Sequence, residues 1–181
     1  MRKVVLNLAV TLDGFIEGSN GEIDWCIMDQ EMDFDGFLDS VDTIFYGRVS
    51  YDEWGNYKVD ETANHSEQTM WKKIHSKKKY VFSRQRREDA EVTYISEHLL
   101  EKVAAIKQKP GKDIWLYGGA SLINSFITKD LIDKYILSVH PIALGKGKPL
   151  FKNLSQSLSL KLENTKVFHS GVIELTYVPQ K

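Results

Sequence analysis

Apolar positions along the chain follow two spacings, one typical of strands and the other of helices. Short, nearly continuous apolar runs predict buried strands, because such runs occur in parallel sheets that are covered on both faces. They lie at residues 4–10, 43–46, 80–83, 92–95, 114–117 and 135–140. Residues 158–178 predict two further strands that pair as an antiparallel hairpin around residues 169–171.

Apolar residues three and four positions apart predict amphipathic helices between these strands. Residues 29–38 show this spacing in spite of Gly36, and Trp71 and Ile74 mark a helix with a lysine-rich outer face. A third helix carries its apolar stripe after residue 98, and we expect Ser96 to be its N-cap. The fourth helix follows Gly119.

Strands and helices alternate through most of the chain, and the last elements are strands. Alternation predicts right-handed crossovers and parallel pairing, whereas the terminal hairpin adds an antiparallel edge. The sequence therefore predicts an α/β fold with a central mixed, mostly parallel sheet and helices on both faces. We expect a single domain over residues 1–181, since no repeat or linker interrupts the pattern.

Composition excludes several classes of protein. The net charge of −1 speaks against a duplex-binding domain, and the single cysteine, Cys26, excludes an internal disulfide. The longest uninterrupted apolar runs fall far short of a membrane span. We therefore expect a reduced, cytoplasmic protein that partners neither a membrane nor nucleic acid.

Two junctions combine glycine with the start of a predicted helix. At the first, Gly47 lets a ligand approach the backbone, Arg48 offers a charged planar fork and Ser50 a hydroxyl. At the second, Gly118 and Gly119 follow an apolar strand and permit unusual backbone geometry near a phosphate. Each junction alone is also explained by an ordinary turn, but two of them in one sheet favour a dinucleotide site.

Other candidate chemistry is weaker. The glycine-rich residues 145–149 lack a third glycine in the required place and predict a surface loop. Acidic residues gather around Trp25, where helix-capping roles explain most of them and at most one is expected to act in a site. The five histidines share no ligand-like spacing, so no metal site is expected.

Five short motifs occur in an order that resembles a known superfamily. They are VTLDGFI at 10–16, IDW at 23–25, FYGRVSY at 45–51, YGGASL at 117–122 and PIALGKGKPLF at 141–151. Together they resemble the dihydrofolate reductase superfamily, in particular the bacterial branch related to the C-terminal reductase domain of the riboflavin-biosynthesis deaminase/reductase. The resemblance covers nearly the whole chain.

The resemblance implies a dihydrofolate reductase-like fold and NADPH as the hydride donor. It places Gly47, Arg48 and Ser50 at phosphate groups, with Arg48 a candidate for the 2′-phosphate. Ser83 matches a position near the adenosine. The residues that match the pyrophosphate turn are Gly118, Gly119, Ala120, Ser121 and Leu122, and those beside the nicotinamide are Ala9 and Ile16.

The resemblance is less definite for the substrate. Trp25 matches a tryptophan that precedes a catalytic carboxylate in folate reductases. Counting forward from Trp25 leads to Asp29, whereas counting back from Gly47 leads to Glu31. We take Asp29 and Asp13 as catalytic candidates and Trp25 as a substrate contact, and we do not expect true dihydrofolate reductase activity.

Three functions compete at this point. The leading prediction is an NADPH-dependent reductase of a small heterocyclic or carbonyl compound, and the alternative is an NADPH-binding module of the same fold without turnover. Nucleic-acid binding through the lysines at 72–79 and nearby arginines has the least support, because such a run is usually a solvated face. Relatives of the riboflavin branch pair as dimers, so a homodimer is expected.

Overall fold

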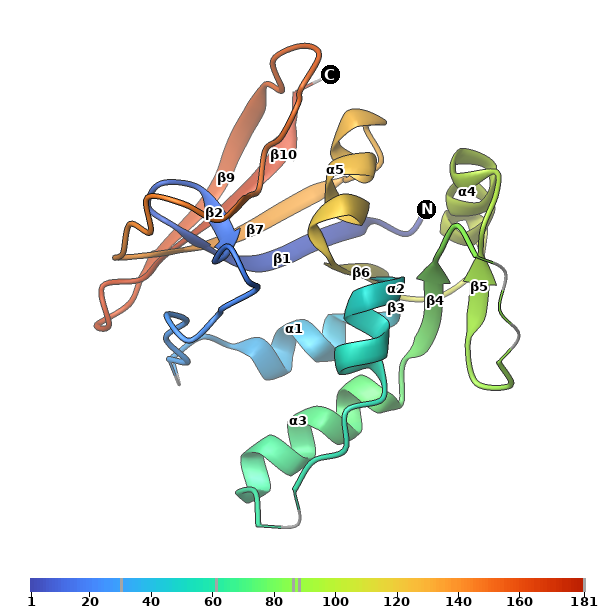
Figure 1. The fold of residues 1–181 in the computed structure, drawn as a ribbon, viewed down its shortest axis with the longest axis horizontal. Helices are drawn as coiled ribbons and strands as arrows, with labels where there is room; N and C mark the ends of the chain where they lie inside the picture. The colour runs from blue at the N-terminus through green and yellow to red at the C-terminus, as the bar shows by residue number, and fades with distance from the viewer. Residues whose placement is uncertain (30, 61, 86, 88, 181) are drawn as a thin grey trace. The chain divides into compact units, whose positions relative to one another are not determined.

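The computed structural model describes residues 1–29, 31–60, 62–85, 87 and 89–180. The chain forms two compact units (Figure 1). Unit 1 consists of Met1–Arg2 and Asp33–Gly119, and unit 2 consists of Lys3–Met32 and the chain from Ala120 onward. The single domain expected over residues 1–181 stays a prediction.

Unit 1 contains four parallel strands in the order β5-β4-β3-β6. Their bounds are β3 Val41–Gly47, β4 Lys78–Phe82, β5 Thr93–Ile95 and β6 Asp113–Gly118. Gly47 pairs with Phe82 of β4, and Tyr46 pairs with Gly118 of β6. The carboxyl ends of β4, β3 and β6 therefore lie side by side at one edge.

The helices of unit 1 begin later than the sequence predicts in two places. Their bounds are α1 Phe34–Ser40, α2 Arg48–Ser50, a π-helical turn Tyr51–Gly55, α3 His65–His75 and α4 Leu99–Gln108. The helix expected over 29–38 starts only at Phe34, because Asp33 is its N-cap and accepts a hydrogen bond from the Gly36 amide at 2.9 Å. The expected cap at Ser96 is wrong, since His98 takes that position with φ +55°.

Aromatic side chains dominate the core of unit 1. Trp115 of β6 meets the rings of Phe34 and Phe37 edge-on, with centroids 5.6 and 5.5 Å away. Trp71 and Ile74 of α3 are buried in the same cluster. The apolar stripe that predicted α3 is thus the face that holds this helix in the unit.

Unit 2 is built on a mixed set of strands. Its bounds are β1 Val4–Thr11, β2 Phe15–Glu17, α5 Ala120–Thr128, β7 Lys134–His140, β8 Lys148–Pro149, β9 Leu160–Val167 and β10 Ile173–Pro179. β1 pairs with β7 in parallel, whereas β10 is antiparallel to both β7 and β9. The antiparallel C-terminal hairpin is therefore confirmed.

The glycine-rich segment 145–149 is more ordered than a surface loop. Lys148 and Pro149 form β8, which pairs with β2, and Lys148 forms an ion pair with Glu17. A Cβ atom on Gly147 would overlap the carbonyl oxygen of Glu17, so only glycine fits there. In the described ranges of the chain, helices are too short or too polar to cross a bilayer.

Candidate cofactor and substrate sites

The first candidate site is the strand edge of unit 1. Gly47 ends β3, Ser83 follows β4 and Gly119 follows β6, and the register of these strands makes the three positions neighbours. Ligands of open parallel sheets bind at the carboxyl ends of strands. The structure therefore brings together six of the predicted cofactor residues, namely Gly47, Arg48, Ser50, Ser83, Gly118 and Gly119.

A close approach of two backbone segments shapes this edge. A Cβ atom on Gly119 would lie 2.8 Å from the hydroxyl oxygen of Ser50, so the glycine leaves room that a side chain would fill. Gly118 has φ +122°, a conformation that residues with a side chain rarely adopt. Ser50 and the two glycines therefore form a small cradle, in which Gly118 is buried and Gly119 is partly exposed.

The start of α2 faces the same edge and has no side-chain cap. Its N-cap is Gly47, which has no side chain to accept a hydrogen bond from the first amides. These amides and the positive end of the helix suit an anion such as a phosphate.

Two arginines flank one carboxylate beside this helix start. Arg48 and Asp52 form an ion pair at 2.8 Å, and Arg87 contacts the other oxygen of Asp52 at 3.1 Å. The three side chains are about 40% exposed, so an incoming anion can reach them. The net charge of this triad is +1, and any phosphate that binds Arg48 competes with Asp52.

The geometry of this edge fits a phosphorylated dinucleotide. It offers a glycine cradle, uncapped amides and two arginines within unit 1. Arg87 and Asp52 were missed as site residues in the sequence, where Arg87 belongs to a basic run that predicted a solvated face. Only the i,i+4 spacing of Arg48 and Asp52 could have indicated their pairing.

The remaining predicted cofactor residues lie in unit 2. Ala9 is half-buried in β1, and Ile16 is 9% exposed in β2. Ala120, Ser121 and Leu122 form the first turn of α5, directly after Gly119. Leu122 is buried, and Ser121 is exposed at the helix surface.

Asp13, a predicted catalytic residue, holds a loop in place. Its exposed carboxylate accepts hydrogen bonds from the Thr11 hydroxyl at 2.6 Å and from the amides of Gly145 and Leu144 at 2.7 and 3.2 Å. The Thr11 hydroxyl first, and then the Gly145 amide, lower the pKa of Asp13 below its ordinary value. These contacts make Asp13 a positioning residue for the glycine-rich segment, and its catalytic role stays a prediction.

Replacing Asp13 with asparagine should therefore loosen residues 144–145. Because the pKa of Asp13 is lowered in the folded state, its stabilising effect is complete above the unfolded value of 3.8 and is lost as the pH falls through the folded value. We expect the Gly145 amide to exchange about tenfold faster in Asp13→Asn. Asp24→Asn, at another exposed acid of unit 2, should leave this exchange unchanged, and equal rates in both variants would contradict the assignment.

The predicted substrate residues of unit 2 lie on the segment between β2 and α1. The Trp25 ring meets His140, the buried last residue of β7, edge-on at 5.3 Å. His140 Nδ1 lies 2.9 Å from the carbonyl oxygen of Ser138, and its Nε2 lies 3.4 Å from that of Ile27. Trp25 is thus held against the end of β7, a contact that the sequence did not indicate.

Asp29 and Glu31, the two candidates left open by counting, have different surroundings. The Asp29 carboxylate accepts a hydrogen bond from the Glu31 amide at 2.9 Å, and Ser170 contributes most to lowering the pKa of Asp29. Glu31 lies 3.1 Å from His169 Nδ1. A carboxylate with a lowered pKa is a poor proton donor near neutral pH, so Asp29 fits an anionic role better than that of a general acid.

Cys26 and the acidic and histidine side chains add no reactive thiol or metal cluster to the described part of the chain. Burial, and then the charge of Asp24, raise the pKa of Cys26 to about 11, so its thiol stays protonated and unreactive at neutral pH. Among the residues that the structure describes, no three histidine, cysteine, aspartate or glutamate side chains are grouped to hold a metal ion.

Known proteins share both the sequence and the fold. YyaP of Bacillus subtilis (strain 168) is 54% identical over 177 residues, which cover 97% of this chain and 94% of YyaP. A putative riboflavin biosynthesis protein from Shewanella sp. PV-4 superposes with a TM-score of 0.80 at 24% identity over 99% of both chains. Dihydrofolate reductase from Enterococcus faecalis, complexed with NADP(H) and RAB-propyl, superposes with a TM-score of 0.66. Its sequence identity is 15%, over 99% of this chain and 97% of the enzyme.

These superpositions confirm the predicted fold class, the dihydrofolate reductase-like α/β fold with a mixed, mostly parallel sheet. The suspected resemblance to the riboflavin-biosynthesis reductase branch is confirmed as well. The family model of the RibD C-terminal domain matches residues 2–173, nearly the whole chain. The chain therefore belongs to the RibD C-terminal domain family.

Proposed function

We propose that the chain is an NADPH-dependent oxidoreductase that transfers a hydride to a small heterocyclic or carbonyl compound. The strand edge of unit 1 carries this proposal, because its glycine cradle and its two arginines suit a phosphorylated dinucleotide. A RibD-type family and a reductase-type fold support the same conclusion. NADPH, when bound, supplies the hydride from C4 of its nicotinamide ring.

The residues of unit 1 would hold the phosphate groups. The amides at the start of α2 and the Gly118–Gly119 cradle would bind the pyrophosphate, and Arg48 with Arg87 would contact the 2′-phosphate. Ser83 accepts a hydrogen bond from the Gln85 amide at 3.0 Å, and its own hydroxyl proton is available for the adenosine ribose. Binding of this kind positions the cofactor and excludes water from the hydride.

Residues of unit 2 would serve the reacting groups. By the resemblance, Ala9 and Ile16 would lie beside the nicotinamide and Trp25 beside the small-molecule substrate. Asp13 and Asp29 are the candidates that orient a proton-carrying water or bind a cationic part of the substrate, since both have a lowered pKa.

A second candidate function, an NADPH-binding module without turnover, has one observation in its favour. Both catalytic candidates are carboxylates whose pKa is lowered, so neither supplies a proton near neutral pH. A titration of the folded chain with NADPH and NADH, followed by NADPH oxidation with a panel of heterocyclic and carbonyl acceptors, decides the matter. Oxidation supports the reductase, binding without oxidation supports the module, and binding of neither cofactor contradicts both.

The ion-pair triad predicts opposite effects at neighbouring residues. Arg48→Ala should weaken the binding of NADPH about tenfold or more and that of NADH much less, because only NADPH carries the 2′-phosphate. Asp52→Asn should strengthen the binding of NADPH, since it removes the carboxylate that competes for both arginines. Equal losses for NADPH and NADH in Arg48→Ala would mean that Arg48 does not contact the 2′-phosphate.

We also infer a homodimer in the reduced cytoplasm. Exposed apolar side chains on the hairpin, Leu162 and Val167 of β9 and Ile173 of β10, support an interface there. Light scattering of the purified chain should give a mass twice the 20.8 kDa of one copy. Val167→Lys should lower this mass toward that of one copy. A monomer at micromolar concentration would contradict the dimer.

A further inference from the structure

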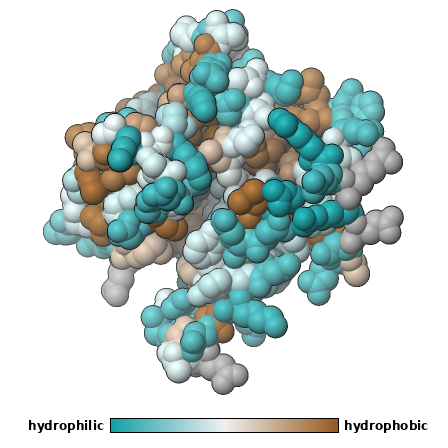
Figure 2. Space-filling view, in the orientation of Figure 1, coloured by the Kyte–Doolittle hydropathy of each residue, from teal (hydrophilic) through white to brown (hydrophobic). Residues whose placement is uncertain are grey.

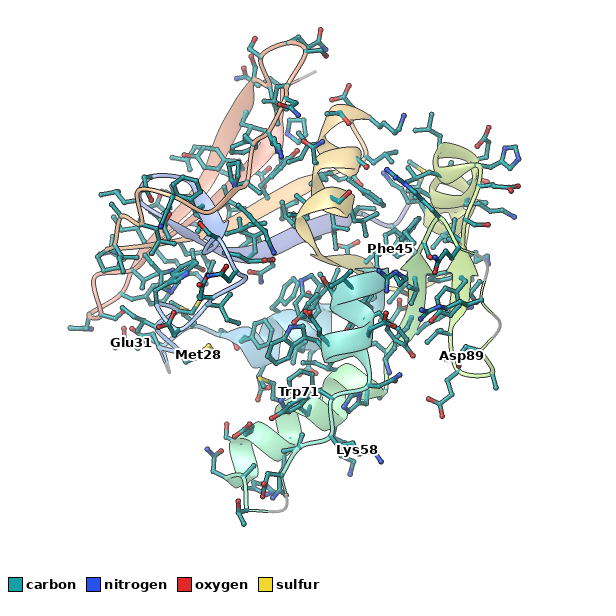
Figure 3. The ribbon with its side chains drawn as sticks, viewed as in Figure 1. Met28, Glu31, Phe45, Lys58, Trp71 and Asp89 are labelled. Atoms are coloured by element: carbon teal, nitrogen blue, oxygen red, sulfur yellow. The ribbon has the colours of Figure 1, made fainter. Side chains whose placement is uncertain are left out.

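A groove of about 760 Å³ in unit 1 lies beside α3, away from the residues predicted for the cofactor. Its walls come from α3, from the segment after the π-helical turn and from β4. In Figure 3, Trp71 lies on α3 and Lys58 on the segment that passes next to this helix. The lining residues used below are Tyr57, Lys58, Trp71, Lys72, His75 and Lys79.

Lys79 is the most unusual residue of this groove. It is only 8% exposed, yet among the described residues no side chain forms a hydrogen bond or an ion pair with its ammonium group. Burial is the main cause that lowers the pKa of Lys79, and the charges of Glu91 and Asp89 act against this from a distance. The stem of Lys79 is buried while its ammonium group stays accessible at the groove, so a compact anion there can supply the counter-charge that the group lacks.

Two further lysines surround the same space. Lys58 and Lys72 are exposed on the groove, and neither has an ion-pair partner in the part of the chain that the structure describes. Glu91 is the acidic residue of the lining, so the described walls carry an excess of positive charge. This arrangement favours a ligand with a compact negative group.

Part of the groove lining is aromatic. Tyr57 packs on Trp71 with ring centroids 4.7 Å apart, and His75 stacks on Trp71 at 5.6 Å and 27°. His75 Nε2 lies 2.8 Å from the Tyr57 carbonyl oxygen, which fixes the two segments against each other. Trp71 is 7% exposed and Tyr57 36%, so the ring of Tyr57 is the part of this wall that a ligand can contact.

The surface character agrees with a polar ligand. Figure 2 shows the region around α3 mostly in white and teal, with few brown residues. Lysine is strongly hydrophilic, and tyrosine and tryptophan are close to neutral on this scale. A flat aromatic surface beside cations is therefore a better match for a planar, charged molecule than for an apolar partner.

We propose that this groove binds a small anion that carries a planar ring, with the chemistry of a nucleoside monophosphate. The anionic group would bind Lys79, with Lys58 and Lys72 beside it, and the ring would stack on Tyr57. This site does not depend on the proposed reductase activity. A nucleic-acid strand fits less well, because the groove offers one exposed ring and a small group of lysines rather than a repeated track of rings and cations.

The test is a calorimetric titration of the full chain with adenosine monophosphate and with inorganic phosphate. We expect saturable binding of the nucleotide with a dissociation constant below about 1 mM, and phosphate about tenfold weaker. Lys79→Met should weaken nucleotide binding at least tenfold. Lys102→Met, at an exposed lysine of α4, should leave the affinity for the nucleotide unchanged. Tyr57→Leu should weaken the binding of the nucleotide but leave the binding of phosphate unchanged.

Binding at the strand edge must be distinguished from binding in the groove. A nucleotide at the edge would lose affinity in Arg48→Ala and keep it in Lys79→Met, and this result would overturn the proposal. The absence of saturable binding to the unmodified chain would overturn it as well. Neither outcome concerns hydride transfer, which is measured separately with NADPH.

Stability gives an independent readout for Lys79. Without a ligand, Lys79→Met should raise the unfolding midpoint by about 2–4 °C, because it removes a charge that partial burial disfavours. Adenosine monophosphate should raise the midpoint of the unmodified chain but not that of the variant. A variant that is less stable yet binds the nucleotide normally would show that Lys79 only supports the fold.

Discussion

Gly118→Ala is expected to weaken NADPH binding about 100-fold or more. The positive φ of +122° at Gly118 strains any residue with a side chain, at a cost of about 1–3 kcal/mol. The strain falls on the turn that must present its amides to the pyrophosphate, so relaxation moves these amides away from the ligand. Equilibrium titration with NADPH measures the loss.

Gly119→Ala tests the same cradle by a different route. Its Cβ atom would meet the Ser50 hydroxyl at 2.8 Å, and that short side chain must rotate away. Adding Ser50→Ala should relieve the crowding and restore the unfolding midpoint, but not the affinity for NADPH.

A matched glycine serves as the control for both variants. Gly171 also has a positive φ, +84°, but lies on the β9–β10 hairpin. Gly171→Ala should lower stability and leave NADPH affinity unchanged. Normal affinity in Gly118→Ala and Gly119→Ala would contradict the assignment of the glycine cradle to the cofactor.

Arg2→Met is expected to lower the free energy of unfolding by about 3 kcal/mol, because a buried arginine that donates three charged hydrogen bonds is removed. The Arg2 side chain is 6% exposed and forms an ion pair with Asp42. It also donates to the Thr43 hydroxyl at 2.6 Å and to the carbonyl oxygen of Lys112. Removing it leaves these acceptors without their donor beside the start of β3.

Thermal unfolding provides the measurement. For a chain of this size the loss corresponds to a midpoint about 6–12 °C lower. Arg84→Met, at an exposed arginine of the same unit, should shift the midpoint by less than about 1 °C. Equal unfolding midpoints for the two variants would show that Arg2 does not stabilise unit 1.

Most strands of the large sheet could be predicted because they are short apolar runs, whereas the short strands β2 and β8 were missed because they lack such a run. The starts of the helices were harder to predict. Those of α1 and α4 are determined by the N-caps Asp33 and His98, through capping and backbone conformation rather than apolar spacing. The strand edge was predictable for a similar reason. Glycine and its neighbour arginine stand next to each other in the sequence, and parallel strands align their ends.

The parts of the site that the sequence did not reveal depend on contacts between distant residues. Asp13 binds amides about 130 positions away, and Arg87 reaches Asp52 from another loop. Lys79 belongs to a run of lysines that predicted a solvated face. Strand β4 instead buries it, together with every residue that follows it in the strand.

The division of the chain has a consequence for the order of folding. Apart from two residues, unit 1 is one continuous stretch, Asp33–Gly119, whereas β1 of unit 2 must pair with β7. Val4 and its partner Asp133 are 129 positions apart. Closing so long a loop is slow, and during synthesis unit 1 can fold before β7 has left the ribosome to pair with β1. The β1–β7 pairing thus forms only late in synthesis, after the whole of unit 1 has been made.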